Sequence, residues 1–245
     1  MKLFFILVML NFKVYGATII IDPGHGGEEK GAVSPIDGTQ EKDLALYVAK
    51  KIKENLIDDH HVYLTRTQNQ TITLEQRSLS AQKIGADLFI SVHLNSSESS
   101  NSNGFETYYL DSNQEAASNK IVRVENGEHS HPMKKDPSMD FLTGEILADI
   151  VVSKNIPLSK ELGNEVHDAI SKGISKEYKV KDRGLKPGLF YVLAMSKVPG
   201  VLLEVGFLSN KNDLRLIKDK GFLDKYSKHA AIGIKNYLNS KMDKN

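Results

Sequence analysis

The sequence contains no cysteine. A disulfide framework is therefore excluded, and an exported form of the chain would have to be held together by its core. Thiolate-rich structural zinc sites are excluded as well, so any metal ligands must be His, Asp or Glu. The sequence also has little excess charge of either sign. A formal net charge of +1 gives no electrostatic case for nucleic-acid binding.

Long hydrophobic runs are almost absent, and the one candidate lies at the N-terminus. Lys2 precedes an unbroken apolar run over residues 3–10, and Val14-Tyr15-Gly16 resembles a small-residue cleavage site. The run is too short to cross a bilayer, so residues 1–16 are predicted to be a secretory signal peptide. The alternative is a buried N-terminal strand or helix. No later stretch is apolar for long enough to be a transmembrane segment.

The remainder, residues 17–245, has the length of one α/β domain. Apolar runs and helical periodicity alternate along it, which favours this fold class. Strands are expected at residues 17–21, 61–65, 87–92, 104–110, 189–193 and 198–205, and helices at 41–56, 74–84, 158–174 and 224–238.

Residues 111–155 break this alternation. The segment is polar and weakly periodic, with two short helical candidates at 114–125 and 141–152. Loops of this length are uncommon in compact domains and are usually functional or disordered. It is therefore interpreted as an insertion in the domain.

Two histidines follow strands directly. His25 lies in a glycine-rich loop after the first strand, and His93 ends the strand over 87–92. Parallel strands place their carboxyl ends at one edge of a sheet, where α/β proteins bind ligands. Glu41 opens the helix after the first strand and should face the same crevice. Two imidazoles and a carboxylate are a common ligand set for catalytic zinc. Asp22 competes with Glu41 for the third position, or serves the turn or a histidine's other nitrogen.

Glu204 follows the apolar run Val201-Leu202-Leu203. Ionised carboxylates are rarely buried without a partner. Beside a metal, this carboxylate could act as a general base and then pass the proton to the leaving amine. The structural alternative is an ion pair with Arg183 or Lys186.

Nucleotide binding is disfavoured. The dinucleotide fingerprint G-x-G-x-x-G beginning at Gly24 requires glycine where the chain has Glu29, and no Walker pattern exists. The glycines are better explained by a sharp backbone turn around His25.

Seven segments together resemble the zinc-dependent N-acetylmuramoyl-L-alanine amidases of the amidase 3 family. They are IIIDPGHGG (19–27), Glu41 at its helix start, LTRT (64–67), ADLFISVHLNS (86–96), GFETYYL (104–110), RGLKPGLFYVL (183–193) and VLLEVGFLSNKND (201–213). They occur in the family's order and cover nearly the whole of residues 17–245.

The resemblance implies that His25, Glu41 and His93 bind Zn²⁺ and that Glu204 is the catalytic carboxylate. It implies hydrolysis of the amide between N-acetylmuramic acid and L-alanine of the peptidoglycan stem peptide, in cell-wall remodelling or daughter-cell separation. The implied fold is a twisted, mostly parallel sheet with helices on both faces.

The cell-division amidases in this family carry an insertion at the place of residues 111–155. There a helix places a glutamate on the zinc until an activator protein removes it. Val124-Glu125-Asn126 resembles the family's Glu-Asn pair, which makes Glu125 the candidate autoinhibitory residue, although residues 127–137 depart from the pattern.

Two other functions remain open from the sequence. One is a zinc peptidase or deacetylase with the same ligands acting on another cell-wall amide. The other is a catalytically inactive domain that binds cell wall. Glu204 argues against the inactive domain, because a binding module has no need of a carboxylate in that apolar run.

If residues 1–16 are a signal peptide, the protein works in the periplasm or cell envelope. N-terminal sequencing of exported material should then begin near Ala17. Intact Met1 on soluble cytoplasmic protein would exclude export by this route.

Overall fold

The computed structural model describes residues 16–118, 120–127 and 150–242. Nearly all of the expected signal peptide and most of the expected helix at 141–152 lie outside the described residues. Among those described, no helix is both long enough and apolar enough to cross a membrane.

Six strands form one twisted sheet with the order β2-β1-β3-β6-β4-β5. Their bounds are β1 Thr18–Pro23, β2 His61–Leu64, β3 Leu88–Asn95, β4 Phe105–Leu110, β5 Asp182–Gly188 and β6 Gly200–Phe207. Strands β2, β1, β3 and β6 are parallel to one another. Strand β4 is antiparallel to β6, and β5 is parallel to β4. The expected mostly parallel sheet is confirmed.

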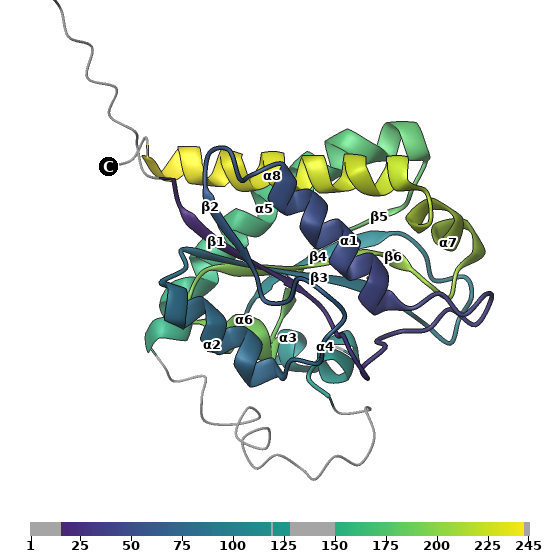
Figure 1. Ribbon diagram of the computed structural model, residues 1–245, viewed down its shortest axis with the longest axis horizontal. Helices are drawn as coiled ribbons and strands as arrows, with labels where there is room; N and C mark the ends of the chain where they lie inside the picture. Colours follow the sequence, from purple (N-terminus) through teal and green to yellow (C-terminus); the bar gives the residue numbers. More distant parts are fainter. Residues whose placement is uncertain (1–15, 119, 128–149, 243–245) are drawn as a thin grey trace, which may run out of the picture.

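Helices cover both faces of the sheet (Figure 1). On one face lie α1 Glu41–Glu54, α5 Ile150–Tyr178 and α8 Lys220–Met242, with the short α7 Lys211–Ile217 beside them. On the other lie α2 Leu74–Ile84, α3 Gln114–Ser118, α4 Lys120–Glu125 and α6 Tyr191–Ser196.

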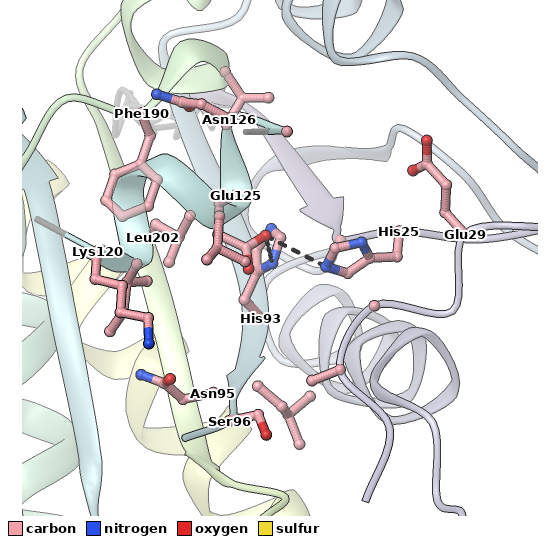
Figure 2. A pocket seen from close by; sticks show the side chains of 18 of the residues that line it. His25, Glu29, His93, Asn95, Ser96, Lys120, Glu125, Asn126, Phe190 and Leu202 are labelled. Atoms are coloured by element: carbon pink, nitrogen blue, oxygen red, sulfur yellow. Dashed lines mark ion pairs between the residues drawn. The ribbon is translucent and has the colours of Figure 1, made fainter. Parts of the chain in front are cut away.

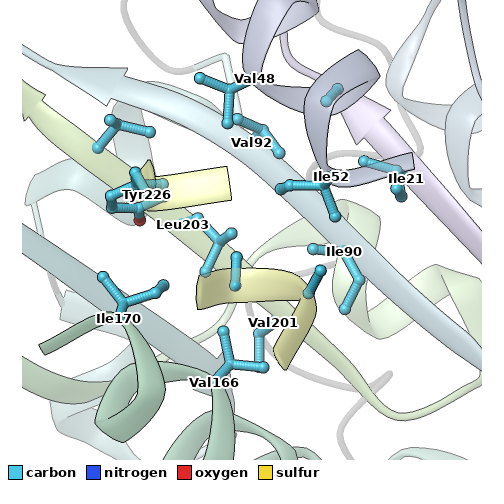
Figure 3. Packing of buried hydrophobic residues seen from close by; sticks show 14 of the residues in the cluster. Ile21, Val48, Ile52, Ile90, Val92, Val166, Ile170, Val201, Leu203 and Tyr226 are labelled. Carbon is cyan, nitrogen blue, oxygen red and sulfur yellow. The ribbon is translucent and has the colours of Figure 1, made fainter. Parts of the chain in front are cut away.

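Side-chain alternation along the strands divides the core in two. Ile21, Ile90 and Leu203 are fully buried against the face of α1, α5 and α8 (Figure 3). Their neighbours Phe89 and Leu202 belong to the smaller cluster under α2 and α6. Because both faces of the parallel strands are buried, these strands read as continuous apolar runs.

The expected strand over residues 189–193 is wrong. Strand β5 ends at Gly188, and the apolar run continues into helix α6 from Tyr191. A short apolar run does not distinguish a strand from a buried helical turn. Strand β5 itself was missed because Asp182, Arg183 and Lys186 give it a polar sequence.

Several helix ends differ from the expected ones. Helix α5 begins at Ile150 rather than at 158 and ends at Tyr178, so Pro157 lies inside it. The helix expected at 114–125 is two short helices, α3 and α4. Helix α2 has the expected bounds, because Thr73 and Gln76 form a reciprocal capping box and Gly85 ends it at φ 61°.

Candidate metal centre

The site lies at the carboxyl edge of the parallel strands. His93 on β3 is paired in register with Glu204 on β6, and both are buried. Side chains on a strand alternate between faces. His93 and Glu204 therefore share a face with Phe89 and Leu202, the face that α2, α4 and α6 cover.

The loop after β1 carries His25 in a left-handed conformation with φ 55°. Gly24 packs directly on the His93 ring, since a Cβ there would lie 2.5 Å from His93 Cε1. Only glycine permits this approach. The loop is thus shaped to bring the two imidazoles together, with ring centroids 5.0 Å apart.

Two arginines, both 2% exposed, fix this loop. Arg66 donates from Nε to the Pro23 carbonyl at 3.0 Å and from Nη2 to the Gly24 carbonyl at 2.7 Å. Arg77 donates to the carbonyls of Pro23 at 2.7 Å and His25 at 2.6 Å. Buried carbonyls need hydrogen-bond donors, and the guanidinium forks supply them.

Glu41 reaches the edge from the start of α1 and is 1% exposed. Its Oε1 accepts from the Leu94 amide at 2.9 Å, and its Oε2 accepts from the Ala32 amide at 2.7 Å. These bonds orient the carboxylate between the histidines. Oε2 lies 3.2 Å from His25 Nε2, and Oε1 lies 3.0 Å from His93 Nδ1.

Glu125, the last residue of α4, completes the group (Figure 2). Its Oε2 lies 2.8 Å from His93 Nδ1 and 3.3 Å from His25 Nε2. One donor atom from each of the four residues lies within 4.8 Å of the others, so the group could hold a metal ion.

Several polar atoms in this group of four residues lack a hydrogen-bond partner among the described residues. His25 Nε2, His93 Nδ1 and Glu125 Oε2 are buried, and none has a partner with hydrogen-bond geometry among the described residues. Native structures rarely leave such atoms unpaired. Two imidazoles with carboxylates fit the nitrogen and oxygen ligand sets of zinc.

The electrostatics also favour a cation between these side chains. Burial would lower the pKa of both histidines, but the carboxylates of Glu41 and Glu125 outweigh it. They raise the pKa of His25 to about 9 and that of His93 well above its usual range. Burial likewise opposes ionisation of Glu41, yet His25 and His93 lower its pKa to about 2. Positive charge at this point is stabilised.

Glu204 is close to these four residues but is not one of them. It is 1% exposed, and its Oε2 has no partner among the described residues. Burial and then the charge of Glu125 raise the pKa of the Glu204 carboxyl well above its usual range. A raised pKa makes this carboxyl group a better proton acceptor than an ordinary glutamate.

Asp22, the competing ligand, is engaged elsewhere. Its Oδ1 accepts from the Thr65 hydroxyl at 2.6 Å and from Arg77 Nη1 at 2.7 Å, and its Oδ2 accepts from Ser91 at 3.1 Å. It lies outside the group of four and anchors Arg77 under the His25 loop.

The proposed ion pair of Glu204 with Arg183 or Lys186 is wrong. Both cations bind Glu106, a fully buried carboxylate on β4. Sequence reasoning missed Glu106 because it considered only strands that end at this edge. Strand β4 is antiparallel and begins there, opposite Glu204. The sequence signal that could have identified it is that Glu106 is the one charged residue in the strand segment GFETYYL (104–110).

Asn126 fastens α4 over the site. Its Nδ2 donates to the Leu189 carbonyl at 3.0 Å, and its Oδ1 accepts from the Tyr191 amide at 2.8 Å. Val122 of the same helix is buried in the smaller core. Glu125 is therefore held at the cluster by specific contacts of its own helix.

A cavity of about 600 Å³ opens between α4 and the sheet edge. Its walls include His25, His93, Asn95, Glu125 and Arg183. Cavities of this size that combine apolar walls with a few converging polar groups are typical ligand sites.

The comparisons with known proteins agree with this geometry. The sequence profile of the N-acetylmuramoyl-L-alanine amidase family matches residues 19–236. The chain belongs to this family. Membership confirms the family resemblance and the enzyme class that the sequence predicted.

Among relatives, the amidase AmiA of Escherichia coli K12 is 32% identical over 225 residues, which are 90% of this chain and 75% of AmiA. LytC of Bacillus subtilis 168 is 29% identical over 93% of this chain, which spans only 37% of LytC. The solved CwlD amidase of Clostridioides difficile, in complex with the lipoprotein GerS, is 26% identical with a TM-score of 0.69. That match covers 92% of this chain and all of CwlD.

Arg77 should be essential for holding the amidase loop that carries His25. Arg77→Met leaves Asp22 charged and buried without its cation, which should lower the free energy of unfolding by about 3–5 kcal/mol. Urea unfolding measures this, and Asp22→Asn combined with Arg77→Met should recover part of the loss. Lys51→Met, which breaks the exposed pair with Glu54, should cost at most about 1 kcal/mol. Equal stability of the two single variants would contradict the assignment.

Proposed function

We propose that this chain is a zinc-dependent hydrolase that cleaves the amide bond between N-acetylmuramic acid and L-alanine in peptidoglycan. The supporting observation is the convergence of buried, unpaired imidazole nitrogens and a carboxylate oxygen on one point. It occurs in a chain whose family is named for this reaction. Because that substrate is cell-wall material, the protein would act in the cell envelope, in wall remodelling or daughter-cell separation.

His25 through Nε2, His93 through Nδ1 and Glu41 would be the zinc ligands. Glu41 is the best oriented of the three, since two backbone amides hold its oxygens. Bound Zn²⁺ would supply Lewis acidity, polarising the scissile carbonyl and lowering the pKa of the attacking water.

Glu204 would act as general base and then as general acid. Its buried carboxyl has a raised pKa and an unpaired oxygen, so it can take a proton from water and hand it to the departing L-alanine amine. This role also favours an enzyme over an inactive wall-binding domain. A peptidase or deacetylase would need the same residues, and family membership favours the amidase.

Glu125 would inhibit this site in the state described here. It is the one donor of the four carried by the polar insertion, and it lies where a zinc site for hydrolysis needs an open position. Release would require α4 to move away. We propose that a partner protein moves α4 away. The similar CwlD amidase was solved in complex with the lipoprotein GerS, which supports a search for such a partner.

The ligand assignment predicts that His93→Ala loses most bound zinc and nearly all activity. Metal content per folded protein, by mass spectrometry after native purification, measures this. For the zinc content, His167→Ala is the matched control, since His167 is equally buried but pairs with Thr107 and Asp182 away from the cluster. Full zinc occupancy in His93→Ala would refute the assignment.

The general-base assignment predicts that Glu204→Gln keeps its zinc but loses kcat by about 10²–10⁴-fold, because the amide cannot accept the proton. Initial rates on purified cell wall, with zinc content measured in parallel, test this. Glu54→Gln, an exposed change far from the site, serves as control. Activity within a few-fold of wild type would exclude the role.

Autoinhibition predicts that Glu125→Ala raises basal activity on purified cell wall, because the fourth donor is lost. Asn126→Ala should also raise it, since the contacts of α4 to Leu189 and Tyr191 are broken. Deleting residues 113–154 with a short linker should give the largest increase. Gln114→Ala, on the exposed start of α3, should leave the rate unchanged. If all three site variants match or fall below the wild-type rate, the insertion is not inhibitory.

A further inference from the structure

Arg183 is a wall of the metal-site cavity that the reaction described above does not use. It lies at the start of β5, and its side chain is 26% exposed. Its Nε donates to Glu106 Oε2 at 2.7 Å. Among the described residues its Nη groups have no hydrogen-bond partner, so these donors are available to a ligand at the cavity wall.

The guanidinium is held in place from several sides. Its plane lies over the Phe207 ring, with Cζ 5.0 Å from the ring centroid. Glu106 is itself fixed, since its Oε1 accepts from Asn95 at 2.8 Å and from Tyr108 at 3.1 Å. Such pre-positioning reduces the entropy lost when a ligand binds.

The backbone beneath Arg183 is fixed as well. The neighbouring Asp182 accepts from the Gly184 amide at 2.8 Å and contacts His167 Nε2 at 2.9 Å. Ser171 donates to the same carboxylate. The strand start is therefore tied to α5, and Arg183 cannot easily swing away from the cavity.

The local charge favours an anion. Glu106 is the only acid within ion-pair distance of Arg183 in the described part of the chain, and it is shared with Lys186, which lies outside the cavity wall. A planar guanidinium with free Nη donors matches a carboxylate, which it can bind through two parallel hydrogen bonds.

We infer that Arg183 binds a free carboxylate on the stem peptide, on the residue that follows L-alanine, and so determines which peptidoglycan the site accepts. This inference rests on the proposed amidase function. Arg183 is a binding residue in this account, and the bond that breaks is still the amide at the metal site. Wall material in which that carboxylate is amidated would be a poor substrate.

The experiment compares two synthetic muropeptides that differ only in a carboxylate or a carboxamide on the residue after L-alanine. Zinc-loaded enzyme with the Glu125→Ala change is used, so that the site is open. The carboxylate substrate should have a kcat/KM roughly 10–100-fold higher, the range for a hydrogen bond to a charged group.

Arg183→Gln should abolish this preference by lowering kcat/KM for the carboxylate substrate alone. Lys186→Gln is the matched control, because it loses a pair to the same Glu106 but does not line the cavity. It should keep the preference. If Arg183 had only a structural role, Arg183→Gln would lower kcat/KM equally for both substrates, and that result would overturn the inference. Equal kcat/KM values for the two substrates in the parent enzyme would overturn it as well.

Calorimetric binding of the two free stem peptides separates this inference from the proposed function. If the parent cleaves neither muropeptide, the amidase proposal fails. Tighter binding of the carboxylate peptide that is lost in Arg183→Gln would still support Arg183. Equal binding of the two peptides, or no binding of either, would overturn it.

Discussion

The site depends on the burial of one ionised carboxylate, that of Glu41. It is 1% exposed, and the histidines hold its pKa at about 2 against the effect of burial. Such a charge is costly unless it is paired and hydrogen-bonded. The amides of Ala32 and Leu94 donate to its two oxygens, and both imidazoles lie within ion-pair distance of them. Because Leu94 follows His93 on β3, one carboxylate ties the helix start, the loop and the strand end together.

The other residues at this edge of the sheet hold the His25 loop and Glu41 in position. The His25 loop makes few backbone bonds of its own, and buried arginines satisfy its carbonyls. Arg77 in turn needs Asp22 as its counter-charge. Gly31, at φ 65°, leaves room for Glu41, since a Cβ there would lie 2.5 Å from its Oε2. The arrangement of His25, Glu41 and His93 is therefore held by packing and polar contacts of the protein itself.

How much the sequence could predict follows from the same physics. Buried parallel strands are continuous apolar runs, so β1, β3 and β6 were visible, and with them the shared edge of His25, His93 and Glu204. Strand β5 was not visible, because a polar edge strand and a short helix lack a distinctive period. The position of Glu125 at the imidazoles was implied only by resemblance, since nothing in the local sequence of α4 specifies where its end docks.

Glu106 on β4 and Glu204 on β6 lie opposite each other in the sheet, yet their surroundings shift their pKa values in opposite directions. Burial opposes ionisation of both. For Glu106, Lys186 and Arg183 overcome it and lower the pKa, whereas for Glu204 the nearby carboxylates add to it and raise the pKa. Paired acids with divergent pKa values usually divide roles. Glu106, whose pKa is lowered, is then the carboxylate that holds Arg183 at the cavity wall. Glu204 has the raised proton affinity that its proposed role requires, and the antiparallel entry of β4 is what places both carboxyl groups at one edge.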